Sequence, residues 1–162
     1  MAFSWSTAAL AIRSAQLLFA FILLGLTAYV VRWYNEDTMT ASPSQFNWPL
    51  AASVISIVSA LYLELAPRFA PKATQPLASF GLEAVNALFH FSAFVALAVF
   101  MSRLLFCRGS VCSSAQASVA FGAVEFLLWT ASAAIAAREA FRGGLSFRRR
   151  PGSAPEMAQA SP

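Results

Sequence analysis

The sequence predicts an all-α fold: a polytopic membrane protein built as a four-helix transmembrane bundle with short loops. Four apolar runs occur in 162 residues, each close to the ~20 residues that a helix needs to cross ~30 Å of hydrocarbon. None alternates apolar and polar residues as barrel strands do, and only helices and closed barrels satisfy their backbone hydrogen bonds in lipid. Hydrophobic residues make up 59% of the chain and charged residues 11%, whereas soluble domains average about 45–50% and about 25%.

The first two spans are bounded by clear local signals. The first run lies between Arg13 and Arg32. It is long for a signal peptide and no good cleavage site follows it, so we expect a retained span. The second run begins at Asn47–Pro49, which supplies a capping residue and a proline for the first turn, and we expect Pro67 and Pro71 to end it. The four expected spans are residues 14–31, 49–66, 82–105 and 115–137.

The spans divide the chain into three parts. We expect a short N-terminal tail at 1–13, a transmembrane domain at 14–137 and a basic, largely disordered tail at 138–162. Residues 151–162 in particular have no apolar period, as is typical of disorder. The loops are too short to hold a separate soluble catalytic domain.

The distribution of basic residues predicts the orientation. Eight Lys and Arg residues fall in the two tails and the middle loop, and three fall on the other side. Because cytosolic flanks carry the excess of Lys and Arg, we expect both termini to be cytosolic.

The C-terminal tail carries most of the positive charge. The net charge of +4 is not spread along a soluble face, so no nucleic-acid partner is expected. The tail is placed to attract anionic lipid headgroups, although a simple topology signal explains it equally well. Its five arginines are Arg138, Arg142, Arg148, Arg149 and Arg150.

The two cysteines, Cys107 and Cys112, lie in the loop predicted between the third and fourth spans. In an oxidising compartment so close a pair predicts a local disulfide, with a redox-active pair and two free thiols as alternatives. A metal site would need two more ligands, and the only histidine lies inside a span. No metal or cofactor is therefore expected.

Polar residues inside the spans are the candidates for chemistry. Glu83, Asn86 and His90 share one face of the third span, and Glu125 lies near the middle of the fourth. A charged residue at a helix centre costs ~2.5–3.5 kcal/mol to insert, so Glu125 should face the bundle interior. A hairpin about Gly109 would place His90 one helical turn from it in depth, which makes Asn86 or His90 the expected partner.

These polar residues allow two interpretations. They are either contacts that hold helices together or parts of a proton or cation pathway. Gln16 in the first span is a further polar contact, and Glu83 is expected near the cytosolic interface, where it complements the N-terminus of its helix. Small residues spaced by four predict close helix packing, unless the spacing is chance: Ala52, Ser56 and Ala60, and Ser118 and Gly122.

Several local sequences, taken together, resemble the MARVEL-domain proteins, particularly the fungal ones. One departure is Phe89-His90, beside which a tryptophan is expected. The matching segments are Ile12–Leu17, Gly25–Tyr29, Leu82–Phe89, the paired outer cysteines and Ala120–Phe126.

The resemblance implies a four-helix membrane protein with cytosolic termini that is not an enzyme. Such proteins are associated with membrane apposition, vesicle trafficking and lateral membrane organisation. We therefore expect such an organiser in the plasma membrane or a secretory-pathway membrane. Its expected partners are the lipid bilayer, anionic lipids and other membrane proteins in homo- or hetero-oligomers. The alternative is a small oligomeric transporter or channel that uses Glu125, His90 and Asn86. A thiol oxidoreductase would need a second cysteine pair.

Overall fold

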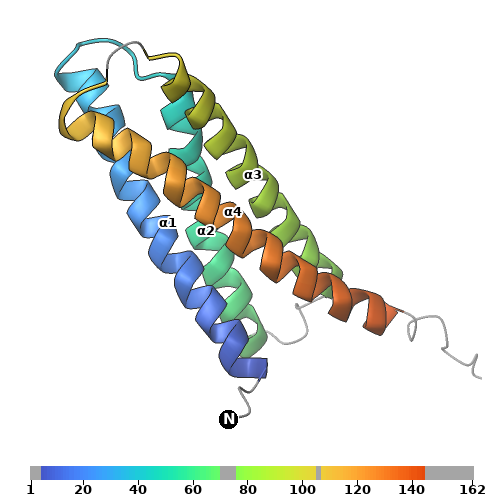
Figure 1. The fold of residues 1–162 in the computed structure, drawn as a ribbon. Helices are drawn as coiled ribbons and strands as arrows, with labels where there is room; N and C mark the ends of the chain where they lie inside the picture. Colours follow the sequence, from blue (N-terminus) through green and yellow to red (C-terminus); the bar gives the residue numbers. More distant parts are fainter. Residues whose placement is uncertain (1–4, 70–75, 105–106, 145–162) are drawn as a thin grey trace, which may run out of the picture.

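The computed structural model describes residues 5–69, 76–104 and 107–144, which form one bundle of four helices. The helices are α1 (Trp5–Glu36), α2 (Ser44–Phe69), α3 (Pro76–Ser102) and α4 (Gly109–Gly144). Successive helices run antiparallel and pack side by side, and α4 closes the bundle against α1 (Figure 1). The predicted all-α four-helix bundle is confirmed.

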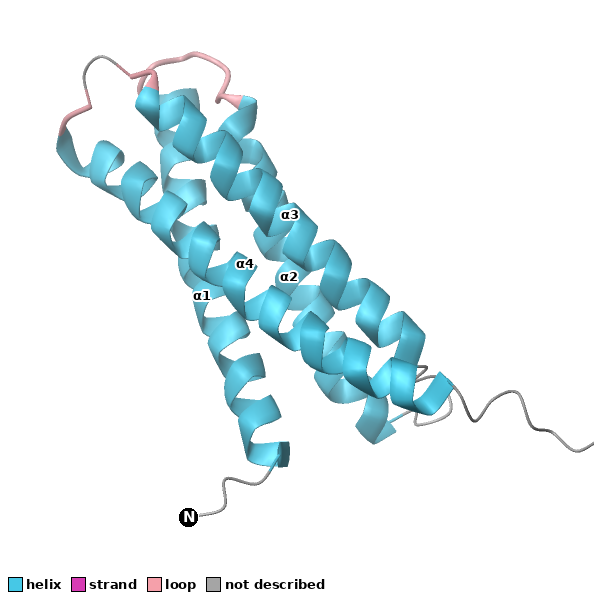
Figure 2. Ribbon diagram, turned by 45° about the vertical axis from the view of Figure 1, so that its right-hand side comes forward, coloured by secondary structure: helices cyan, strands magenta, loops and turns pink. Residues whose placement is uncertain are grey.

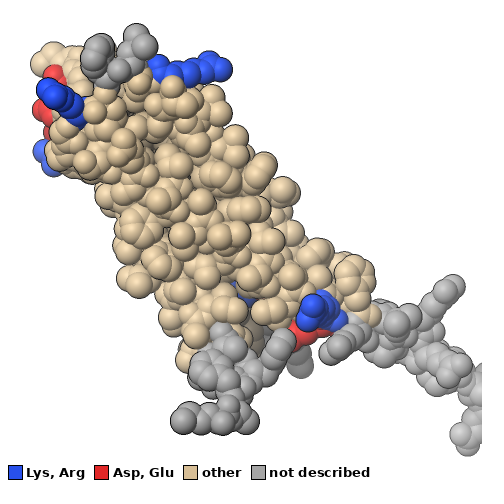
Figure 3. All heavy atoms as spheres, viewed as in Figure 1, with Lys and Arg blue, Asp and Glu red and all other residues tan. Residues whose placement is uncertain are grey.

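The bundle has two distinct ends. We call the end where α1 begins and α4 ends the termini end, and the opposite end the disulfide end (Figure 1). Each helix is long and apolar enough to cross a membrane. The flank between the ends is almost free of charged side chains, which gather near the two ends (Figure 3). Large apolar residues such as Leu18, Val58, Leu88 and Leu127 are exposed on this flank, which is therefore the lipid-facing surface.

Three helix boundaries differ from the prediction: both ends of α2, which lie near prolines, and the end of α3, which leads into the third loop. α2 begins at Ser44, one turn before Pro49, and the amide of Phe46 donates to the Pro43 carbonyl at 2.9 Å. It also passes through Pro67 instead of ending there, because a proline in the last turn costs few helical hydrogen bonds. α3 ends at Ser102 and not at residue 105. Its end tightens into i→i+3 bonds, in which the Arg103 amide donates to the Phe100 carbonyl at 3.2 Å.

The first and last helices reach beyond the predicted spans. α1 begins at Trp5, so much of the expected N-terminal tail is helical. α4 continues to Gly144 and includes Arg138 and Arg142, which were assigned to a largely disordered tail. The hydropathy of a segment reports only the part inside the hydrocarbon, whereas the helical hydrogen bonds continue past it.

The core differs between the two halves of the bundle. Toward the disulfide end, Val30, Phe46, Leu97 and Ala115 form an apolar cluster. Toward the termini end, Trp129 packs with Ala60 and Ala87 amid buried polar residues. The predicted small residues, Ala52, Ser56, Ala60, Ser118 and Gly122, are all buried.

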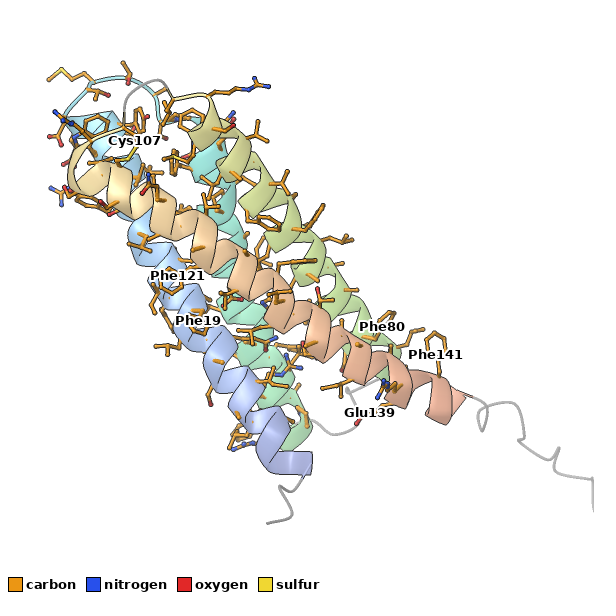
Figure 4. All side chains as sticks on the ribbon, in the orientation of Figure 1. Phe19, Phe80, Cys107, Phe121, Glu139 and Phe141 are labelled. Atoms are coloured by element: carbon orange, nitrogen blue, oxygen red, sulfur yellow. A yellow bond between two sulfur atoms is a disulfide. The ribbon has the colours of Figure 1, made fainter. Side chains whose placement is uncertain are left out.

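α3 and α4 approach each other closely at Gly122. A Cβ atom added there would lie 3.1 Å from the Cβ atom of Phe94. On the other side of α4, Phe121 points toward Phe19 of α1, with 5.7 Å between the ring centres (Figure 4). The small residue therefore admits α3, and the large one beside it fills the space toward α1.

Candidate functional site: a buried polar network

The network begins with an ion pair between α1 and α3. The Arg13 guanidinium contacts the Glu83 carboxylate through Nη2, and its Nη1 donates to Gln16 Oε1 at 3.0 Å. The same guanidinium lies 5.7 Å from the ring centre of Trp129, within cation–π range. Glu83 is only 2% exposed and lies early in α3, toward the termini end. Its burial is tolerated because Arg13 enters the bundle with it.

Gln16 extends the network from α1 to α4. Its Nε2 donates to Ser132 Oγ at 3.1 Å, and Ser132 Oγ donates to the Trp129 carbonyl at 3.2 Å. Gln16 is fully buried. Three helices are thus linked by side chains near the termini end.

Glu125 lies at the centre of the second half of the network. Trp129 Nε1 donates to Glu125 Oε2 and to Ser56 Oγ, each at 2.8 Å. Ser56 Oγ also lies 3.5 Å from Glu125 Oε2, as a donor to it. Glu125 is fully buried, so the carboxylate is enclosed by the bundle and not exposed to lipid. Its hydrogen bonds come from α2 and from its own helix.

His90, one of the expected partners of Glu125, lies beside it. Its Nε2 is 3.7 Å from Glu125 Oε2, within ion-pair range but too far for a hydrogen bond. Asn86 instead donates from Nδ2 to the Leu82 carbonyl of its own helix at 2.8 Å.

Five buried polar atoms have no hydrogen-bond partner among the described residues. They lie along one face of α3 and at the facing position of α4, from near the termini end to the middle of the bundle. Buried polar atoms are normally paired, so this row marks a place that favours polar ligands or water. The atoms are Glu83 Oε2, Asn86 Oδ1, His90 Nδ1, His90 Nε2 and Glu125 Oε1.

Each end of the bundle holds a cavity. The cavity at the termini end measures about 210 Å³ and is lined by residues of all four helices, including Arg13, Glu83 and Ser132. The cavity at the disulfide end measures about 350 Å³ and is mostly apolar and aromatic, with Trp33 and Phe100 in its wall. The described residues include no group of three or more His, Cys, Asp or Glu that could hold a metal ion.

A disulfide joins Cys107 to Cys112, with 5.4 Å between the Cα atoms (Figure 4). The predicted pairing is confirmed. Only Cys107 lies in the loop, however, because α4 begins at Gly109 and takes up Cys112. Gly109 has a φ of 86°, a conformation that favours glycine and that lets the chain turn into the helix.

Four participants in the network were not predicted from the sequence. Arg13 was used only as a topology signal and in the family resemblance, and Trp129 and Ser132 were not singled out. Ser56 was noted only as a small packing residue. One signal was available for Trp129, which lies four residues after Glu125 and therefore on the same helix face.

The expected lipid-contacting arginines are only partly within the described residues. Arg138 is exposed on α4, and Arg142 lies in the last turn of that helix. Arg148, Arg149 and Arg150 lie outside the described residues.

Comparison with known proteins identifies the family. The model of the MARVEL family, a membrane-associating domain, matches residues 4–135. The chain belongs to the MARVEL family. No curated protein and no solved structure matches the chain. The match covers the first three spans, most of the fourth and the whole polar network, so this MARVEL chain is a multi-pass integral membrane protein in contact with the lipid bilayer.

Proposed function

We propose that this MARVEL protein is a non-enzymatic organiser of membranes, acting in lateral structure, membrane apposition or vesicle trafficking. One observation carries the proposal: buried polar side chains from all four helices bind one another, while the flank offers apolar surface to lipid. Such a molecule is equipped to contact lipids and other membrane proteins. The plasma membrane or a secretory-pathway membrane is its proposed location.

The proposed orientation has both termini in the cytosol. The excess of Lys and Arg on that side supports this orientation, although the charge of Arg13 is balanced by its ion pair with Glu83. The arginines from Arg138 onward would then face the anionic leaflet and recruit acidic lipids. The apolar flank supports homo- or hetero-oligomeric contacts in the membrane.

Imaging of a tagged full-length chain tests the organiser function. Its distribution should be patchy, and removal of the protein should redistribute other membrane proteins or slow the delivery of secretory vesicles. Diffuse staining together with unchanged distribution and delivery in its absence would contradict the proposal.

A transporter or channel is the second candidate, favoured by the unpartnered atoms of Glu125, His90 and Asn86. The geometry of a single bundle provides only half of a pathway. Beyond Glu125, toward the disulfide end, the buried cluster of Val30, Phe46, Leu97 and Ala115 is apolar. The buried hydroxyls in that half, those of Thr27, Ser53 and Ser118, already donate to carbonyls of their own helices. Proton-dependent flux into proteoliposomes, abolished by Glu125→Gln, would establish this candidate and displace the organiser.

A further inference from the structure

The cavity at the disulfide end lies where the bundle meets the lipid headgroups. It measures about 350 Å³, within the ~300–1,000 Å³ of small-molecule sites. Trp33 and Tyr34 in its wall belong to the last turn of α1, and Arg108 directly precedes α4. Figure 2 shows the loops of this end, in pink, beyond the helix ends. Aromatic residues at the end of a membrane-spanning helix lie at headgroup level, so a headgroup of this leaflet can reach the cavity.

Aromatic rings form much of the accessible wall. Trp33, Tyr34 and Phe100 line the cavity and are each partly exposed. The rings of Trp33 and Tyr34 meet edge to face, with 5.1 Å between their centres, and therefore form a corner instead of a flat stack. Ring faces attract cations, and sites lined by several rings bind quaternary ammonium groups in particular.

Arg108 gives the same wall an unpaired positive charge. Its side chain has no ion-pair or hydrogen-bond partner among the described residues, and the described wall contains no carboxylate. The Ser110 hydroxyl also lines the cavity, 2.9 Å from the Tyr29 hydroxyl. Either hydroxyl can donate in that bond, so Tyr29 can be the donor and leave the Ser110 proton for a ligand. A guanidinium with a hydroxyl beside it suits a phosphate group.

The surrounding charges favour one direction for a bound zwitterion. A neighbouring cavity shares Trp33 with this one, and its wall holds Arg32, Glu36 and Asp37, which sum to one negative charge. A cation beside Trp33 is attracted by that charge, while an anion is attracted by Arg108. The complement of this arrangement is a ligand with a cation at one end and a phosphate at the other.

We propose that this cavity binds the phosphocholine headgroup of a phospholipid from the leaflet at the disulfide end. The quaternary ammonium packs against the rings of Trp33 and Tyr34, and the phosphate accepts from the Arg108 guanidinium and the Ser110 hydroxyl. The acyl chains stay in the leaflet beside the apolar flank. The site does not depend on the organiser function, because it requires only that the bundle lies in a membrane.

Other common headgroups fit this cavity less well. An ethanolamine headgroup has three N–H groups that lose water on binding, and the described wall has no carboxylate to accept from them. A glycerol headgroup keeps the phosphate contact with Arg108 but offers no cation to the rings. The discriminating feature is thus the quaternary ammonium.

Native mass spectrometry of the full-length chain tests the proposal. The protein is released from an uncharged maltoside detergent with equal amounts of choline, ethanolamine and glycerol phospholipids that have the same acyl chains. We expect the choline lipid to be preferred over each of the others by at least about threefold, which one cation–π contact supports. A smaller preference, or stronger binding of the glycerol lipid, would overturn the proposal.

Substitutions of the rings test the ammonium end of the site. Trp33→Leu removes a ring but keeps an apolar side chain, so the preference for choline over ethanolamine should fall close to unity. Tyr34→Leu tests the second ring, and serves alone if the first variant does not fold. Trp48→Leu is the matched control, because this tryptophan is 38% exposed near the start of α2 and is absent from the wall. A preference that survives both wall substitutions would overturn the proposal.

Arg108→Gln tests the phosphate end. Choline and ethanolamine lipids share the phosphate, so both should bind several-fold more weakly while the preference for choline persists. Arg103→Gln is the matched control, because Arg103 is exposed at the same end and is absent from the wall. Equal effects of the two substitutions would show that Arg108 attracts lipid only through general charge, which would overturn the proposed phosphate contact.

A soluble ligand could supply the same chemistry. Free phosphocholine has the quaternary ammonium and the phosphate but no acyl chains. We expect it to compete with the choline lipid only at far higher concentration. Equal potency of the free headgroup would assign the site to a soluble choline ester and overturn the lipid assignment.

Discussion

Glu125 accepts hydrogen bonds from two residues, and this determines what its substitution costs. Glu125→Gln keeps a carbonyl acceptor for Trp129 Nε1 and Ser56, whereas Glu125→Leu removes the acceptor of the Ser56 hydroxyl and one of the two acceptors of Trp129 Nε1. An unsatisfied buried group costs about 1–3 kcal/mol, so Leu should lower the free energy of unfolding by about that much more than Gln. Thermal unfolding in lipid nanodiscs measures the difference. Equal stability of the two variants would show that hydrogen bonding to Glu125 contributes little.

The Arg13–Glu83 ion pair should behave as a unit. Arg13→Met or Glu83→Met alone leaves a buried charge unpaired, which typically costs about 3–5 kcal/mol, whereas the double variant leaves none. The double variant should therefore lose less stability than the sum of the two single variants, as measured by unfolding in the same nanodiscs.

A second ion pair provides the control for this double-mutant cycle, in which two single variants are compared with the double variant. Arg32 and Glu36 lie four residues apart on α1, with side chains 74% and 59% exposed, so their coupling should be small. If the Arg13 and Glu83 substitutions were additive, their coupling free energy would be no larger than that of the Arg32–Glu36 control. That result would contradict a structural role for the buried pair.

At the residue scale, the sequence predicted which polar side chains lie in the spans but not all their partners. Gln16, Asn86, His90 and Glu125 are fully buried, in line with the cost of exposing polar groups to lipid. Partners depend on how the helices are rotated and on their relative depth, which hydropathy does not encode. Arg13 shows the limit most clearly, because a basic residue at the edge of a span resembles a topology signal.

Among the elements, the contact between α3 and α4 depends on Gly122. Alanine in place of glycine inside a helix usually gains about 0.5–1 kcal/mol, since less backbone entropy is lost on folding. Gly25→Ala should show this gain, because nothing lies within 4 Å of the added Cβ. Gly122→Ala should not, because its Cβ would lie 3.1 Å from that of Phe94. Equal gains in thermal unfolding would argue against close packing here.

The disulfide restrains the start of α4. With a sequence separation of 5, the loop is short, and Cys107→Ser with Cys112→Ser should cost about 2 kcal/mol of stability on the chain-entropy estimate. Mass-shift thiol labelling of the unreduced protein should modify neither cysteine. Labelling of both would contradict the bond and also the predicted orientation.

The helices themselves were predictable, and their ends were less so. Hydropathy identified all four spans because lipid requires long apolar helices. The prolines at 49 and 67 led to predicted ends of α2 that lie inside the observed helix. Cys112 was placed in a loop although it lies in the first turn of α4. Helix ends are set by local hydrogen bonding, such as that from Phe46 to Pro43, rather than by hydrophobic composition.

On the scale of the whole molecule, the bundle is polarised. Charged and amide side chains occupy the core from the termini end to Glu125. The rest, up to the disulfide, is mainly apolar and aromatic, and its buried hydroxyls, those of Thr27, Ser53 and Ser118, donate to carbonyls of their own helices. The polar half fixes the relative depth of the helices through directional bonds, and at the other end the disulfide restrains only the start of α4. The apolar flank is left for lipids and partners.

The basic tail provides a prediction for the chain in its membrane. Each Lys or Arg near an anionic leaflet contributes about 1 kcal/mol, within a Debye length of about 8 Å at physiological salt. Arg148, Arg149 and Arg150 changed together to Gln should therefore alter lateral distribution in cells. Topology should remain unchanged, because Arg138 and Arg142 still follow the fourth span.

Liposome binding by a peptide of residues 138–162 separates lipid recruitment from a topology signal. If the tail recruits acidic lipids, the peptide should bind anionic liposomes more tightly than neutral ones, and added salt should weaken that binding because it screens charge. The Gln variant of the peptide should lose most of this preference, because it gives up three of the five arginines. Equal binding to neutral and anionic liposomes would mean that the triplet serves only to set topology, since attraction to a charged leaflet requires the leaflet's charge.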